Sequence, residues 1–131
     1  MELVVLKIID ILRTDSTLQT LLSGTVSDKK VYPGINPSFE NFPCITYEVI
    51  GSFDNEAPRS TQEGLIQLHL YTKASKDNLE DISTRIKTLL QYYKIDTPRI
   101  YELNKQSEID MNETDRLLWG KVLRYTIWSQ A

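Results

Sequence analysis

The stretch Gly64-Leu-Ile-Gln-Leu-His-Leu-Tyr-Thr72 runs almost directly into a second pattern at Ser75 to Tyr93. In the first part Ile66, Leu68 and Leu70 alternate with other residues, and this period of two is typical of a half-buried strand. In the second part the apolar residues recur three and four apart, which indicates one face of an amphipathic helix; they are Leu79, Ile82, Ile86, Leu89, Leu90 and Tyr93. The join predicts a sheet that carries a helix on the face of Ile66.

Further strands are predicted on both sides of this unit. Pro43 to Phe53 alternates in the same way, and Arg99 to Lys105 and Leu117 to Trp128 have strand-like composition. A short strand at Lys30 to Tyr32 is also compatible with the pattern. The connections Asp54 to Glu63 and Gln106 to Arg116 are long and polar, so we expect two exposed hairpin loops.

The N-terminal segment predicts a pair of helices. Leu3, Leu6, Ile9 and the pair Ile11-Leu12 form an apolar stripe that reaches to about Arg13. Asp15 or Ser16 would cap a second short helix, which Gly24 would end. Ser75 is the expected N-cap of the helix over residues 75–93. The fold class is therefore α+β, with one small domain over residues 1–131, a mostly antiparallel sheet of about four strands, an N-terminal helix pair and one amphipathic helix.

Composition narrows the class of protein. The chain has 131 residues, of which 40% are hydrophobic and 25% charged, and its net charge is -3. No block of Lys and Arg is present, which argues against a protein that grips nucleic acid through many phosphate contacts. The start of the chain lacks a basic segment before its apolar residues, so we expect no signal peptide and no membrane span. The single cysteine, Cys44, suits a reducing compartment.

Candidate chemical groups are few. His69 is the only histidine, and we expect a partly exposed strand residue rather than a metal ligand. Cys44 is interpreted as an inert buried or edge thiol. The segment Asp110 to Asp115 fails as a calcium loop, because Lys121 stands where a bidentate glutamate belongs. The acids Asp54, Glu56, Glu80 and Asp81 are expected on loop and helix surfaces, with no convergent partner for general acid-base work. We therefore expect no metal, no cofactor and no enzymatic activity.

The second face of the sheet carries a stronger signal. If Ile66 faces the helices, Leu65 and Tyr71 point away from them, and Ile50 and Trp128 are expected on the same face. Exposed apolar patches usually mark association surfaces. The alternative is that the N-terminal helices cover this face.

Three groups of segments, taken in order, resemble a known family. They are Leu12 to Gly24 as an opening helix pair, Val31-Tyr32-Pro33 followed by Asn41 to Tyr47 as a loop and first long strand, and Gln67 to Leu90 as a strand-to-helix unit. Together they resemble the tail terminator, or tail completion, proteins of long-tailed bacteriophages and prophages. The pieces are degenerate patterns, so their order and spacing carry the resemblance.

The resemblance implies a structural role without catalysis. Such proteins form a ring, commonly of six copies, that caps the tail tube, stops its polymerisation and joins it to the connector of the head. The implied partners are other copies, the major tail tube protein and the head-completion protein, with DNA passing through the lumen without specific binding. The implied location is the host cytoplasm during assembly and then the neck of the virion. Polar residues of the two expected loops are the candidate contacts: Asp54, Asn55, Glu56, Arg59, Glu63, Glu108, Asp110, Glu113 and Asp115.

Two other functions fit the same sequence. A head-side adaptor or stopper would have similar composition and would differ in the ring on which it docks. A small α+β enzyme or ligand-binding domain would instead need a deep pocket with convergent polar groups.

Overall fold

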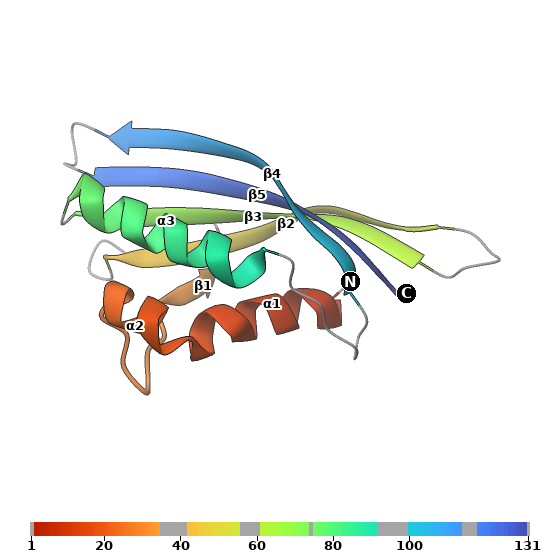
Figure 1. The fold of residues 1–131 in the computed structure, drawn as a ribbon, viewed down its shortest axis with the longest axis horizontal. Coiled ribbons are helices and arrows are strands. Elements are labelled where there is room, and N and C mark those ends of the chain that lie inside the picture. The colour runs from red at the N-terminus through yellow and green to blue at the C-terminus, as the bar shows by residue number, and fades with distance from the viewer. Residues whose placement is uncertain are drawn as a thin grey trace.

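A computed structural model describes residues 2–34, 42–55, 61–73, 75–91, 100–113 and 118–130. Its elements are, in order, α1 (Glu2–Thr14), α2 (Ser16–Leu22), β1 (Val31–Pro33), β2 (Cys44–Asn55), β3 (Thr61–Thr72), α3 (Lys76–Leu90), β4 (Ile100–Glu113) and β5 (Leu118–Gln130). The strands form one five-stranded sheet in the order β1-β2-β3-β5-β4 (Figure 1). The predicted α+β class is confirmed.

The sheet is mixed because of its short edge strand. β1 pairs in parallel with β2, whereas the pairs β2–β3, β3–β5 and β4–β5 are antiparallel. β1 ends at Pro33, which lacks the backbone N–H needed to extend a ladder. The prediction of about four antiparallel strands is therefore correct for β2 to β5, and β1 adds a fifth.

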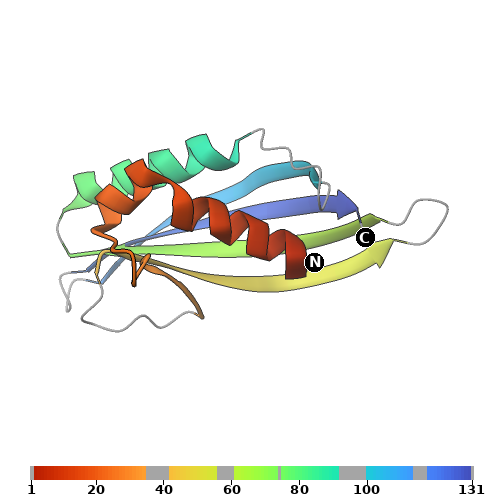
Figure 2. The same cartoon turned by 90° about the horizontal axis from the view of Figure 1, so that it is seen from below.

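All three helices lie on one face of the sheet (Figure 2). Ile66, Leu68 and Leu70 are fully buried against this helix layer, as predicted. α1 and α2 pack beside α3 and share its apolar core. The alternative in which the N-terminal helices cover the second face is therefore wrong, because their apolar residues are already used on the first face.

The helix ends follow local capping chemistry. The Asp15 carboxylate accepts a hydrogen bond from the Leu18 backbone N–H at 2.8 Å, and Ser75 Oγ accepts one from the Asn78 N–H at 3.0 Å. α2 ends at Ser23 in the left-handed conformation (φ 56°), one residue before the predicted Gly24. α3 ends at Leu90, short of the predicted residue 93, which lies outside the described residues.

The apolar stripe of α1 is rotated relative to the prediction. Val4, Val5 and Ile8 are buried together with the predicted Ile9 and Leu12, whereas Leu6 is 53% exposed. A helix turns 100° per residue, so a core layer that accepts Val4 and Ile8 turns Leu6 away from it. Leu6 therefore lies on the surface of the molecule, exposed to solvent.

Both predicted loops are shorter than expected. β2 continues to Asn55 and β3 begins at Thr61, so Asp54 and Glu63 belong to the hairpin strands, whose arm extends past the helix layer (Figure 1). β4 continues to Glu113, so the prediction of a loop starting at Gln106 is wrong. The strand continues because polar side chains of β4 form ion pairs with lysines of β5 and α3.

Candidate interaction surface

The face of the sheet opposite the helices is built from alternate residues of four strands. On β3 and β5 the cross-strand pairs Leu65↔Thr126 and Gln67↔Arg124 belong to it. Glu63↔Trp128 continues it toward the end of the sheet. Because side chains alternate along each strand, this outer face also carries Tyr71, as predicted.

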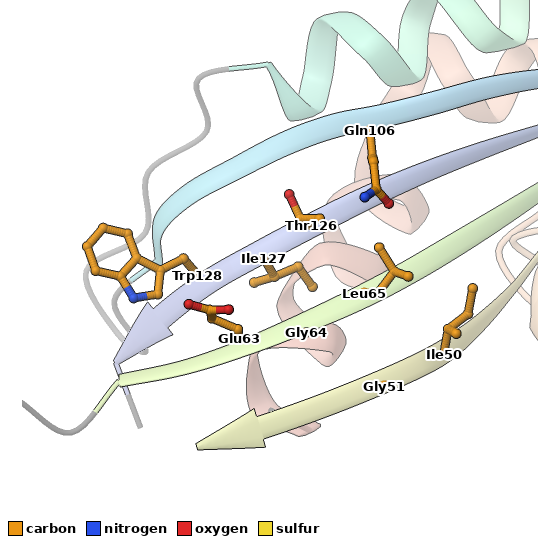
Figure 3. Close-up of a pocket in the computed structure, with 9 residues that line it drawn as sticks. All are labelled: Ile50, Gly51, Glu63, Gly64, Leu65, Gln106, Thr126, Ile127 and Trp128. Atoms are coloured by element: carbon orange, nitrogen blue, oxygen red, sulfur yellow. The ribbon is translucent and has the colours of Figure 1, made fainter. Parts of the chain in front are cut away.

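A shallow depression of about 650 Å³ lies at one end of this outer face (Figure 3). The predicted face residues Ile50, Leu65 and Trp128 line it, and Ile50 and Trp128 are 46% and 39% exposed. We call it the sheet groove, and its full lining is Ile50, Gly51, Glu63, Gly64, Leu65, Gln106, Thr126, Ile127 and Trp128. Tyr71 lies at the other end of β3 and does not contribute.

Gly51 gives the sheet groove its open floor. It follows a bulge in β2 and is opposite Leu65, whose side chain lies on the outer face. A Cβ built on Gly51 would meet nothing within 4 Å, so the missing side chain leaves space that a group from another molecule can occupy. Gly64 lines the groove only through its backbone, because alternation along β3 puts its side-chain position on the helix side with Ile66. Sequence reasoning missed Gly51 because the bulge and the strand register decide which face it serves.

Outside the groove the outer face carries a polar, hydrogen-bonded network and the exposed side chain of Ile109. The Arg124 guanidinium donates to Gln67 Oε1 at 2.7 and 3.1 Å. Gln67 Nε2 lies 3.0 Å from His69 Nε2, and Glu48 Oε1 lies 3.5 Å from that ring nitrogen. His69 is only 7% exposed, so the expectation of a partly exposed histidine is wrong. The ring of Tyr71 stacks on it with the centroids 6.3 Å apart.

A charge cluster lies on the helix side of the sheet. Lys121 Nζ donates to Glu80 Oε1 at 2.7 Å and Glu108 Oε1 at 2.8 Å, and Asp110 Oδ1 is 3.4 Å away. Glu108 also accepts from Lys87 and Lys105. The cluster thus joins β4, β5 and α3. Glu80 thus has a salt-bridge partner that lies 41 residues away in the sequence.

The cluster shifts the pKa values of its members. The hydrogen bond from Lys121, supported by Lys105 and Lys87, lowers the pKa of Glu108 to about 2 although burial opposes this. Burial disfavours the charge of Lys121, whose side chain is 5% exposed, but the hydrogen bonds to Glu108 and Glu80 outweigh it and raise the Lys121 pKa. Both groups are therefore charged at neutral pH.

Stability should fall in acid through Glu108. Its pKa is lowered from 4.5 to about 2 on folding, so the ionised form stabilises the fold fully above pH 4.5 and this contribution is lost as the pH falls toward 2. With allowance for solvent screening, we expect about 1–2 kcal/mol. The measurement is urea unfolding of the wild type and Glu108→Gln between pH 7 and pH 3. The stability difference between them should shrink as the pH falls, and a difference independent of pH would contradict this account.

Other reactive groups are sequestered. Cys44 is fully buried, and burial raises its pKa to about 12, so the thiol is inert as predicted. Among the described residues, no group of three or more His, Cys, Asp or Glu could hold a metal ion. No described helix has the length and apolarity needed to cross a bilayer.

The predicted contact residues that the structure describes lie in strands rather than in loops. Asp54 and Asn55 end β2, and Glu63 lies near the start of β3 on the outer face. Glu108 and Asp110 lie in β4, where they face Lys121, and Glu113 ends that strand. The remaining candidates, Glu56, Arg59 and Asp115, lie outside the described residues.

A second apolar surface lies on the helix side, between α1 and β2. Leu6, Ile9 and Tyr47 line a hollow of about 330 Å³ together with Lys7, Asp10 and Arg13. Val49, two residues after Tyr47 on the same face of β2, is 43% exposed. We call Leu6, Lys7, Asp10, Arg13, Tyr47 and Val49 the α1 patch.

Fold and surface together define a class of protein: a small α+β module with helices on one side of its sheet and an open, partly apolar face on the other. Residues 7–130 match the family described as tail completion protein gp17, and the chain belongs to this family. It is a structural protein of phage tails. The predicted resemblance to tail completion proteins is thereby confirmed.

A solved structure shares the fold. A chain from the virion of a native gene transfer agent particle superposes with a TM-score of 0.75 at 12% sequence identity, over 95% of this chain and 92% of that chain. No curated protein matches the sequence.

Proposed function

We propose that this protein forms a ring, of six copies when assembled, that caps the tail tube, ends its polymerisation and joins the tail to the head. The observation that carries the proposal is the open outer face with its sheet groove, on a chain of the tail completion family. Its partners would be other copies, the major tail tube protein and the head-completion protein, and DNA would pass through the lumen without specific binding.

A docking role agrees with the shape of the surface. Small-molecule sites are usually deep and enclose their ligand, whereas the sheet groove and the hollow of the α1 patch are shallow and open to solvent. The arm formed by β2 and β3 extends past the helix layer and is suited to reach a neighbouring ring or tube (Figure 1). This favours a structural role over catalysis.

The predicted polar contact residues remain candidates, and they differ in how accessible they are to a partner. Asp54, Asn55 and Glu63 lie on the arm, which makes them the first contacts to test. Glu108 is the least available, because three lysines engage its carboxylate. Asp110 is more accessible, with 56% of its side chain exposed.

The test is electron microscopy of the purified protein mixed with tail tubes of the same genome and, separately, with DNA-filled heads. We expect density on one end of the tubes and tubes that no longer grow when tube protein is added. Recruitment to heads with no effect on tubes would instead assign the protein to the head side of the joint. Binding to neither would overturn the proposal.

A further inference from the structure

The exposed apolar side chains gather in two places. Among the residues whose side chains the structure describes, six large hydrophobics are exposed: Leu6, Val26, Val49, Ile50, Ile109 and Trp128. Four of the six belong to the sheet groove or to the α1 patch. Exposed hydrophobics concentrated in two patches indicate two association surfaces.

The two surfaces lie on opposite faces of the same part of the sheet. The sheet groove opens on the outer face, where Leu65 and Trp128 lie, and the α1 patch lies on the side of the helices (Figures 2 and 3). A contact between unlike surfaces is heterologous and can continue from copy to copy until a ring closes, whereas a contact between two like surfaces stops at a dimer.

We propose that the sheet groove of one copy receives the α1 patch of a second copy of this chain. This inference rests on the proposed function, since it names the subunit contact of the ring. Leu6 is the anchor: it is 53% exposed, and the groove floor at Gly51 has space for it. Buried apolar anchors at the centre of a contact contribute most of its affinity.

Charge complementarity favours this pairing over groove against groove. The sheet groove carries the carboxylate of Glu63, whereas the α1 patch carries Lys7 and Arg13 against the single acid Asp10. Placing two grooves together would bring Glu63 of one copy toward Glu63 of the other. Opposite charges at the border of a contact select the partner and its orientation.

Filling the groove tests the contact without disturbing the fold. Gly51→Leu adds a side chain where a Cβ meets nothing within 4 Å, so the variant should fold like the wild type. We expect at least tenfold weaker self-association in analytical ultracentrifugation, and loss of the caps on tail tubes. Asp81→Leu, at an exposed position of α3 outside both surfaces, is the matched control and should associate normally. A Gly51→Leu variant that folds and associates like the wild type would overturn the proposal.

Crosslinking tests the pairing of the two surfaces. Cys44 is buried, so Leu6→Cys and Leu65→Cys introduce accessible thiols one at a time or together. With a short bismaleimide, the double variant should give a ladder of dimers, trimers and larger species, and an equimolar mixture of the two single variants only dimers. Dimers from one single variant alone would show a like-with-like contact and overturn the inference. The reaction is run on concentrated protein and on protein bound to the ends of tail tubes. The absence of a ladder in both samples would also overturn the inference.

Exchanging the charges of Lys7 and Glu63 tests the subunit contact separately from the proposed ring function. Lys7→Glu should weaken association, and Glu63→Lys in the same chain should restore it, whereas Lys76→Glu on α3 is the exposed control with no effect. Failure of rescue, with wild-type protein still capping tubes, would refute the contact and leave the ring function standing. Wild-type protein that assembles through this contact but ignores tubes would refute only the function.

Discussion

Replacing Lys121 with methionine is expected to lower the free energy of unfolding by about 3 kcal/mol. The methionine keeps the length of the side chain but removes the charge on which Glu80, Glu108 and Asp110 converge. Glu80 and Asp110 would then lose the lysine that holds them, Glu108 would keep only Lys87 and Lys105, and the three carboxylates would repel one another beside the apolar core. Urea unfolding followed by circular dichroism measures the loss.

Lys105→Met is the matched control. Lys105 also pairs with Glu108, at 3.0 Å, but its side chain is 41% exposed, so its removal should cost less than about 1 kcal/mol. In the double variant Lys121→Met with Glu108→Leu, the repulsion of Glu108 with Glu80 and Asp110 is gone and part of the stability should return. Equal losses for Lys121→Met and Lys105→Met would show that burial of the cluster does not stabilise the fold.

Gly120→Ala is expected to destabilise the protein by about 2 kcal/mol, because the new methyl group cannot be accommodated. A Cβ at Gly120 would lie 2.5 Å from the main-chain oxygen of Met111 on the neighbouring strand β4. Backbone does not move aside as a flexible side chain does, so the β4–β5 pair must separate locally. Thermal unfolding gives the change in stability, and hydrogen exchange of the β4 amides should show where the pair opens.

Gly51→Ala serves as the comparison for Gly120→Ala. Both glycines lie in strands, but a Cβ at Gly51 meets nothing within 4 Å. Removing the backbone freedom of a glycine in a strand should leave stability unchanged or raise it by about 0.5 kcal/mol. Equal destabilisation of the two variants would show that the contact with Met111 is not the cause of the loss at Gly120.

Local patterns predicted much of the fold. The period of two places Ile66, Leu68 and Leu70 on the buried face, and the spacing of Leu79, Ile82 and Ile86 predicts α3. The caps at Asp15 and Ser75 follow from side chains that bond to nearby backbone N–H groups, so they need no tertiary information. Three of the four residues predicted for the outer surface, Ile50, Leu65 and Trp128, line the sheet groove.

Polar segments were harder to interpret. The second half of β4 carries Glu108 and Asp110 at strand spacing, but a polar stretch gives no hydrophobic signal, so its pattern predicts a loop. Their partners Lys87 and Lys121 are 21 and 13 residues from Glu108, and only the packing of α3 on the sheet brings them together. The burial of His69 likewise depends on neighbours across the strands.

The sequence by itself determined the helices, the caps at Asp15 and Ser75 and the inward face of β3, because these depend on residues that are near one another in the chain. The tertiary structure alone decided that all helices share one face, that Lys121 meets three carboxylates, and that Gly51 lies opposite Leu65 on the floor of the sheet groove. These features depend on strand register, on the bulge after Val49 and on contacts between distant segments. They are set by the packing of the whole chain, which local periodicity does not encode.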